Sequence, residues 1–349
     1  MSAAVRVALD AMGGDNAPGE IVLGAVQAAR EYELGVYLVG REDAIAAELA
    51  KHDTTGLDLP IVHADDVIPM DEHNPAKAVR HRKNTSMVRA LELVKDGSAL
   101  GAVSAGNSGA MMSASLFTLK RLRGVERPAL GGLLPAENGP CMVIDLGANT
   151  DCKPEYLQQF ALMGSIYMER IMRLNFPRVG LLANGEEEGK GNQQVQETHQ
   201  LLKASAATLG INFIGNVEGR HIFGGTVDVV ICDGFVGNVV LKASEGLSKM
   251  ILGSLRAEMT RSLPNKLAAA VLQSDLLKMR KRLDYTEYGG LPLLGVNGPA
   301  IIAHGRSNAK AIKNALRVAR QTAETGVARA IAEGLAKLRT GEEKQEAGV

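Results

Sequence analysis

The segment Asn184–Asn192 combines residue types that suit an anion. It reads Asn-Gly-Glu-Glu-Glu-Gly-Lys-Gly-Asn, in which glycines let the backbone approach a ligand and Lys190 supplies one positive charge. Three residues separate Gly185 from Gly189, and Gly191 stands where a nucleotide-binding P-loop has Ser or Thr for magnesium. The pattern predicts an anion site without nucleotide, formed by Asn184, Gly185 and Lys190. The alternative is an ordinary loop with a solvated acidic turn.

Four more polar, glycine-rich segments each follow an apolar run: Asp10–Asn16, Ser104–Ala110, Gly147–Asp151 and Asp233–Asn238. The second opens a helical pattern, so its N–H groups could hold a phosphate or simply be capped. In the last, the amide of Asn238 could polarise a carbonyl, with capping again as the alternative. The candidate phosphate or substrate contacts in these segments are Asp10, Gly13, Gly14, Asn16, Gly106, Asn107, Ser108, Gly109 and Asp233.

The sequence offers little support for catalysis by a histidine, a metal ion or an activated serine. His304 precedes the last helical pattern without an evident partner; we keep it as a candidate substrate contact, although a structural role is the commoner one for such a residue. No acidic cluster at ligand spacing and no G-x-S-x-G segment is present, so we expect neither a metal site nor a serine hydrolase.

Short apolar runs alternate with helical patterns through residue 234. The alternation predicts an α/β fold with a Rossmann-like, mostly parallel sheet, flanked by helices on both faces and followed by a helical C-terminal part. The carboxyl ends of parallel strands form the ligand-binding edge of such sheets, so we expect the five polar loops to meet there. The expected strands are 5–10, 36–39, 60–64, 101–104, 142–146, 179–182, 212–214 and 227–232; the last two long helices are expected at 239–261 and 307–338.

The composition sets limits on the function. Lys plus Arg (39) equal Asp plus Glu (39), and aromatic residues make up 3%, which argues against nucleic acid as a partner. The three cysteines form no metal-binding pair, no apolar run reaches membrane-spanning length, and a strand begins at Val5. We expect a cytoplasmic globular protein with one α/β catalytic domain over 1–339, in which two subdomains could flank a central groove, and a disordered polar tail over 340–349.

A helical insertion at about 262–284 differs in character. Apolar residues recur on one face from Ala268 to Leu283, and further apolar residues lie off that stripe. The segment could face the core, a second copy of the chain, a membrane surface or an acidic carrier protein. The candidate membrane or carrier contacts are Leu267, Ala268, Val271, Leu272, Lys278, Arg280, Lys281 and Arg282.

The motifs together resemble the bacterial phosphate acyltransferase (PlsX) family from Val5 to about Ala336. The resemblance rests on Leu9–Pro18, Ser104–Ala110, Asp145–Asn149, Asn184–Asn192, Asp233–Lys242, Tyr288–Gly290 and Ala303–Gly305. It implies a fold similar to phosphotransacetylases and to isocitrate and isopropylmalate dehydrogenases. It also implies transfer of an acyl group from acyl carrier protein to inorganic phosphate in phospholipid synthesis, without a cofactor, and catalytic roles for Lys190 and Asn238.

The same resemblance implies a homodimer that associates peripherally with the membrane. Its acyl phosphate would pass to a membrane glycerol-3-phosphate acyltransferase. Two alternatives remain: an NAD-dependent decarboxylating dehydrogenase on the related fold, which would need acidic metal ligands and arginines, and a scaffold that recruits lipid-synthesis proteins. Lys190 and Asn238 favour catalysis over the scaffold.

Overall fold

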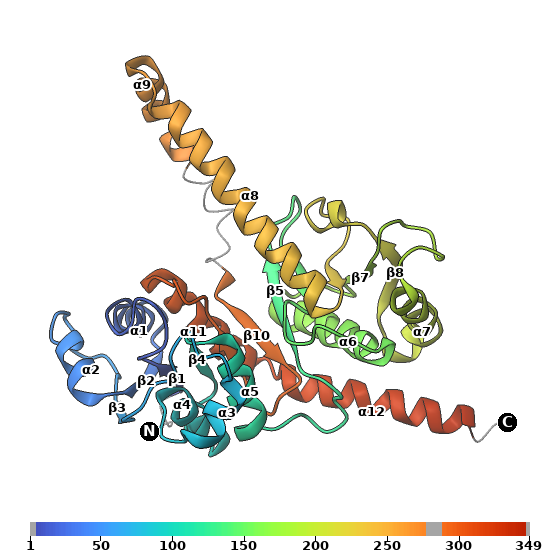
Figure 1. Cartoon of the computed structure of the whole chain (residues 1–349), viewed down its shortest axis with the longest axis horizontal. Helices are drawn as coiled ribbons and strands as arrows, with labels where there is room; N and C mark the ends of the chain where they lie inside the picture. The colour runs from blue at the N-terminus through green and yellow to red at the C-terminus, as the bar shows by residue number, and fades with distance from the viewer. Residues whose placement is uncertain (1–4, 277–287, 347–349) are drawn as a thin grey trace.

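The computed structural model describes residues 5–276 and 288–346. Figure 1 shows two lobes, with the N-terminal strands in one and the segment from β6 to β8 in the other. The described strands are β1 (Arg6–Asp10), β2 (Gly35–Gly40), β3 (Ile61–His63), β4 (Ala102–Ser104), β5 (Ala129–Leu134), β6 (Cys141–Ile144), β7 (Arg178–Leu182), β8 (Asn212–Val217), β9 (Val229–Ile231), β10 (Leu291–Leu294) and β11 (Ala300–Ile302).

Helices cover both faces of the sheet, as expected. They are α1 (Gly19–Tyr32), α2 (Glu42–Leu49), α3 (Pro75–His81), α4 (Ser86–Lys95), α5 (Ser108–Thr118), α6 (Pro154–Ile171), α7 (Gln193–Leu209), the short 3-10 helix η1 (Gly219–Ile222), α8 (Gly234–Thr260), α9 (Leu263–Val271), α11 (Ala309–Glu324) and α12 (Val327–Glu346).

The strands form one sheet in the order β3-β2-β1-β4-β11-β10-β5-β6-β9-β7-β8. Both ends are parallel, which confirms the predicted fold class. Three successive pairings in the middle, β11–β10, β10–β5 and β5–β6, are antiparallel. Because three reversals separate them, the two parallel halves run in opposite directions, and the five polar loops form two groups instead of sharing one edge.

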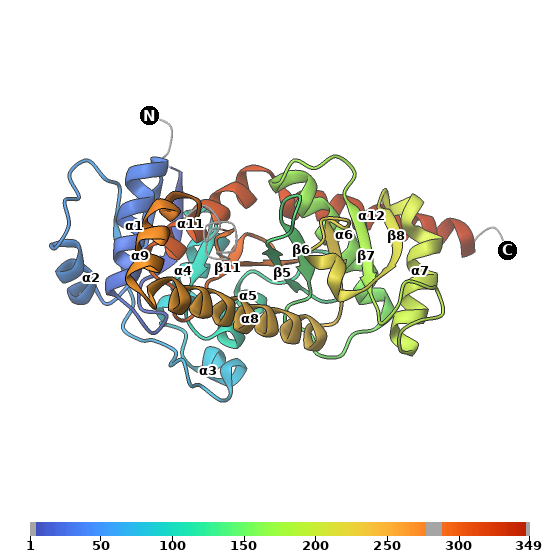
Figure 2. The same ribbon diagram turned by 90° about the horizontal axis from the view of Figure 1, so that it is seen from above.

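We did not predict the three central strands β5, β10 and β11. In β5 the pair Gly131-Gly132 has the composition of a turn, and β10 and β11 are too short to show a period. These strands are buried only because the two lobes pack around them, which is a property of the tertiary structure. They join the lobes into one sheet, as Figure 2 shows from above.

The C-terminal helical pattern divides at Gly326. We expected one helix over 307–338, but α11 ends at Glu324 and α12 begins at Val327, with Gly326 at φ 67°. Glycine reaches this left-handed conformation without steric cost, so the chain turns there. As a result α11 packs on α1 in the first lobe and α12 on α6 and α7 in the second. Helix α12 continues to Glu346, past the start of the expected polar tail at residue 340.

Candidate functional site

A cavity of about 310 Å³ lies between the lobes, over one face of the central strands. Its apolar wall comes from β5, β10 and β11, with Leu130, Leu134, Leu291 and Ile302 among the lining residues. Its opposite side is polar and contains the first turns of α5 and α8 and residues around the start of α11. The polar lining residues are Ser108, Thr150, Asn238, Lys242, Glu245, Tyr288, His304 and Ser307.

The buried carboxylate of Asp145 builds the turn on which α8 rests. It follows β6 and accepts hydrogen bonds from the backbone N–H groups of Gly147 (3.1 Å), Ala148 (3.0 Å) and Asn149 (2.7 Å). Burial raises the pKa of Asp145, and these hydrogen bonds oppose that shift. The turn is therefore held from its inner side, and its outer side faces the cavity.

Helix α8 approaches this turn closely through two glycines. The N–H of Gly234 donates to the carbonyl of Asn149 at 2.7 Å, and a Cβ at Gly237 would lie 1.8 Å from the carbonyl oxygen of Asp145. Asp233 caps the helix by accepting from the N–H of Val236 at 2.8 Å. We expected this helix from Val239, since glycines disfavour helix interiors. The earlier start places Asn238 in the second turn.

Asn238 lies beside Gly147 and lines the cavity. Its side chain is exposed and makes no hydrogen bond with the described residues, so the amide is available to a ligand. One helical turn further along α8, Lys242 lines the same cavity and lies 3.3 Å from Glu245. A carbonyl or a phosphate placed here would find an amide donor and an ammonium group on one helix face.

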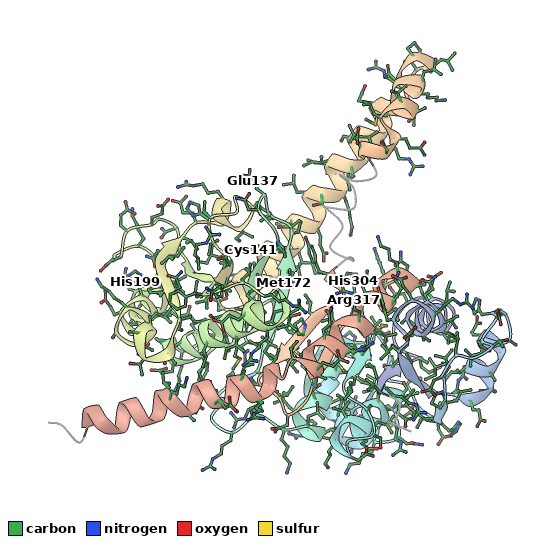
Figure 3. The ribbon with its side chains drawn as sticks, turned by 180° about the vertical axis from the view of Figure 1, so that it is seen from behind. Glu137, Cys141, Met172, His199, His304 and Arg317 are labelled. Atoms are coloured by element: carbon green, nitrogen blue, oxygen red, sulfur yellow. The ribbon has the colours of Figure 1, made fainter. Side chains whose placement is uncertain are left out.

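His304 reaches the cavity from the end of β11 and lies between the lobes in Figure 3. The N–H of Arg306 donates to Nδ1 at 3.1 Å, which leaves Nε2 to carry the proton of the neutral ring. Burial lowers the pKa of His304, and the positive charge of Lys242 lowers it further. A neutral imidazole at pH 7 can donate one hydrogen bond from Nε2 to a substrate.

The loop after β1 lies behind the cavity and braces it. Asp10 is buried, and its carboxylate accepts from the hydroxyl of Ser104 at 2.6 Å; burial raises its pKa. The N–H of Gly106 in turn donates to Ser104 Oγ at 3.0 Å. Asn16 donates to the carbonyl of Ser307 at 3.2 Å. None of the predicted contacts Asp10, Gly13, Gly14 and Asn16 lines the cavity. Through the hydrogen bonds above, the first loop instead holds Ser104 and Ser307 in position.

We left open whether the second loop caps α5 or binds a phosphate. Asn107 has the capping role, and Ser108 is available for the binding role. Asn107 caps α5 by accepting from the N–H of Ala110 at 3.0 Å and donates to the carbonyl of Met70 at 2.9 Å. Ser108 lines the cavity, and its backbone N–H makes no hydrogen bond within the described residues. Gly109 lines a neighbouring cavity, and Gly106 lines neither of the two.

Lys190 lies on the loop that follows β7, the strand next to β9. Strand β7 pairs in parallel with β9, so this loop and the one before α8 leave the sheet at the same edge. Asn184 holds the loop closed by accepting from the N–H of Gly191 at 2.8 Å. The side chain of Lys190 packs over Gly185, is exposed and makes no ion pair with the described residues. Lys190, Asn184 and Gly185 do not line the cavity.

Cations pair with two of the three acidic side chains of this loop. Arg220 binds Glu186 at 2.8 Å, and Lys203 binds Glu188 at 2.6 Å. The buried amide of Asn216 donates to the carbonyl of Glu187 at 2.8 Å and contacts Nδ1 of His199 at 2.9 Å. Glu186 and Glu188 are thus paired with other cations, which weakens the objection to an anion near Lys190.

Sequence reasoning missed part of the cavity lining. Lys242 follows Asn238 by four residues, the spacing that places two side chains on one helix face. A predicted helix that began before Asn238 would therefore have placed Lys242 beside it. Thr150, Glu245 and the apolar wall of β5 carry no such signal. Among the described residues, no group of three or more His, Cys, Asp or Glu side chains could hold a metal ion.

The end of α8 and α9 project from the body (Figure 1). Leu267 and Val271 are 64% and 82% exposed, and Ala268 and Leu272 are exposed too. Lys278, Arg280, Lys281 and Arg282 lie outside the described residues. No helix among the described residues is long and apolar enough to cross a bilayer.

Residues 5–330 match the family model described as "Fatty acid synthesis protein". A phosphate acyltransferase of Pelotomaculum thermopropionicum is 52% identical over 92% of this chain and 92% of its own length. The phosphate acyltransferase of Geobacter sulfurreducens is 50% identical over 94% of both chains. The chain belongs to the phosphate acyltransferase family. The resemblance read from the motifs is confirmed.

Solved structures confirm the fold of this family member. A phosphotransacetylase from Streptococcus pyogenes superposes with a TM-score of 0.64 at 17% identity, covering 93% of this chain and 95% of its own. A 4-hydroxythreonine-4-phosphate dehydrogenase from Klebsiella pneumoniae gives 0.53 at 13% identity, covering 92% and 99%. At these identities the likeness concerns the fold alone. The relatives named as acyltransferases identify this chain as an acyltransferase and do not favour the dehydrogenase or scaffold alternatives.

Proposed function

We propose that this enzyme transfers an acyl group from acyl carrier protein to inorganic phosphate, as a step of phospholipid synthesis. An oxygen of hydrogen phosphate attacks the thioester carbonyl and the C–S bond breaks. The proton of hydrogen phosphate passes to the leaving sulfur. The products are acyl phosphate and the free carrier thiol.

The cavity supports this proposal because an apolar wall faces a polar side. The leucine-rich face of β5 and β10 suits an acyl chain, and Asn238, Lys242 and His304 suit the reacting centre. Phosphate is already nucleophilic at neutral pH, so the enzyme has to position two reactants and stabilise an oxyanion, without an activated Ser or Cys. The chain then requires no cofactor.

We assign Asn238 to the thioester carbonyl or the phosphate, and Lys190 to phosphate and the charge that develops during attack. The free N–H of Ser108 and the Nε2–H of His304 add donors from the other lobe. The unpaired ammonium of Lys190 lies on the loop next to α8 along the sheet edge, which suits an anion that enters from solvent.

The exposed apolar side chains of α8 and α9 support a peripheral membrane location and a homodimer. Leu247, Ile251, Leu267 and Val271 have no cover within the described residues, and such patches commonly bind a partner or a bilayer. From this position a cytoplasmic enzyme would hand acyl phosphate to a membrane glycerol-3-phosphate acyltransferase.

Trapping with hydroxylamine tests the reaction. Enzyme, acyl carrier protein and phosphate should give acyl hydroxamate that depends on phosphate, and its absence would overturn the function. Lys190→Ala and Asn238→Ala should each lower turnover by about 10²- to 10³-fold without unfolding. The control Lys95→Ala removes an exposed lysine from α4 and should leave turnover unchanged. Near-normal turnover of a folded Lys190→Ala enzyme would sink the assignment of that residue.

A further inference from the structure

A second cavity, of about 570 Å³, borders the first. Its lining residues include Pro128, Leu293, Arg121, Arg127 and Tyr156. Leu293 pairs with Leu130 across the antiparallel strands β10 and β5, and Leu291 and Leu130 line the first cavity. Residues two apart on a strand share one face. The two cavities therefore lie end to end along one face of the β10–β5 ribbon.

The boundary between the cavities is the proposed reaction centre. Met112 of α5 lines both. At the start of α5, Ser108 lines the first cavity and Gly109 the second, and in the turn held by Asp145 the same holds for Gly147 and Ala148. A long ligand lying along the ribbon would thus have its middle beside Gly147, where Asn238 is placed.

The segment 120–127, of which Arg121, Glu126 and Arg127 line the second cavity, carries an excess of positive charge. Residues 120–127 contain the four cations Lys120, Arg121, Arg123 and Arg127 and one acid, Glu126, in a chain whose charges balance overall. None of these cations forms an ion pair with a carboxylate in the described part of the chain, whereas arginines such as Arg178 do. Arg121 donates to a backbone carbonyl of the same loop, and Arg127 lies 5.8 Å from the ring of Tyr156.

Exposed apolar groups stand next to this basic segment on α5. Phe117 is exposed, with the guanidinium of Arg80 from α3 lying 4.9 Å from its ring. Leu116 is exposed and lines the second cavity. A basic surface with an apolar centre beside a cavity fits an acidic protein that inserts an arm.

We propose that the second cavity holds the phosphopantetheine arm of the acyl carrier, and that the basic segment 120–127 with Arg80 and Phe117 docks the acidic carrier body. The arm links the thioester to the carrier through a phosphodiester, which guanidinium groups such as Arg121 and Arg127 bind well. The acyl chain extends into the first cavity, and the thioester lies at the boundary. This docking site rests on the proposed function and adds to it the route by which the donor enters.

Charge reversal tests the docking site. Arg121→Glu and Arg127→Glu should each lower kcat/KM for acyl carrier protein about 10- to 100-fold, as loss of a charge-assisted contact requires. The KM for phosphate should change less than about twofold. The control Arg41→Glu makes the same charge change at an exposed arginine of the first lobe, before α2, and should have little effect.

A truncated donor separates docking from chemistry. The acyl thioester of N-acetylcysteamine has neither phosphodiester nor carrier, so both variants should use it as well as the unaltered enzyme does. If charge reversal also abolishes activity with this truncated donor, the neutral variant Arg127→Gln is assayed in place of Arg127→Glu. This variant is suitable because the Arg127 side chain makes a ring contact and no ion pair with the described residues.

Two results would overturn the proposal: carrier kinetics that are unchanged in both variants, or a raised KM for phosphate with an unchanged KM for the carrier. The latter would assign the second cavity to inorganic phosphate. Failure of the proposed function is a different result, namely an unaltered enzyme that forms no phosphate-dependent acyl hydroxamate from either donor.

Discussion

Gly237→Ala tests whether the contact between α8 and the Asp145 turn positions Asn238. The added Cβ would lie 1.8 Å from the carbonyl oxygen of Asp145. Carbon and oxygen atoms that are not bonded approach to about 3.3 Å, so the helix start and the turn must separate by roughly 1.5 Å. Because the neighbouring atom belongs to the backbone, no side-chain rotation relieves the overlap.

The expected effect on activity is larger than the effect on stability. Overpacking of this kind costs about 1–3 kcal/mol. Replacement of glycine by alanine inside a helix returns about 1 kcal/mol, so the net loss of stability should be about 2 kcal/mol or less. A displacement of about 1 Å at a reacting group costs about 10²-fold in rate, and Asn238 is the next residue, so turnover should fall by about that factor.

The assay combines acyl hydroxamate formation with thermal unfolding. Gly253→Ala provides the matched control, since it makes the same change in the same helix, about 24 Å further along its axis, where a Cβ meets no atom within 4 Å. This control should be slightly stabilised and fully active. Gly237→Ala with normal turnover would refute the positioning argument, and equal losses of turnover in both variants would show that the loss does not come from the contact with Asp145.

Four further predictions concern the residues that hold or line the site. Asp145→Ala leaves one buried and three partly buried N–H groups without an acceptor and should lower the free energy of unfolding by about 3 kcal/mol, measured by urea denaturation. Lys242→Met removes a positive charge near His304 and should raise its pKa, which a histidine NMR titration measures. Because the native pKa of His304 is depressed, the unfolded chain binds the proton more readily, and acidification below 6.5 should destabilise the fold. Asn216→Ala frees the carbonyl of Glu187 and should lower turnover about 10-fold by loosening the Lys190 loop, with unchanged turnover as the contrary result.

Local patterns were enough for the peripheral strands. Strands β1, β2 and β7 are apolar runs, so each was predicted close to its observed bounds. The motifs, such as the one from Asp233 to Lys242, were sufficient to identify the family, and the relatives confirmed it. The roles of Lys190 and Asn238 remain predictions until the variants are measured.

The sequence alone determined the fold class, the family and the short set of polar loops, because apolar periodicity and motif spacing are local properties of the chain. Only the tertiary structure decided which loops share a cavity. The cavity over the central strands is lined by Ser108 and His304 from one lobe and by Asn238 from the other, while Asp10 is buried beneath Ser104. The pairing of β10 with β5 joins residues more than a hundred positions apart, so no local pattern records it.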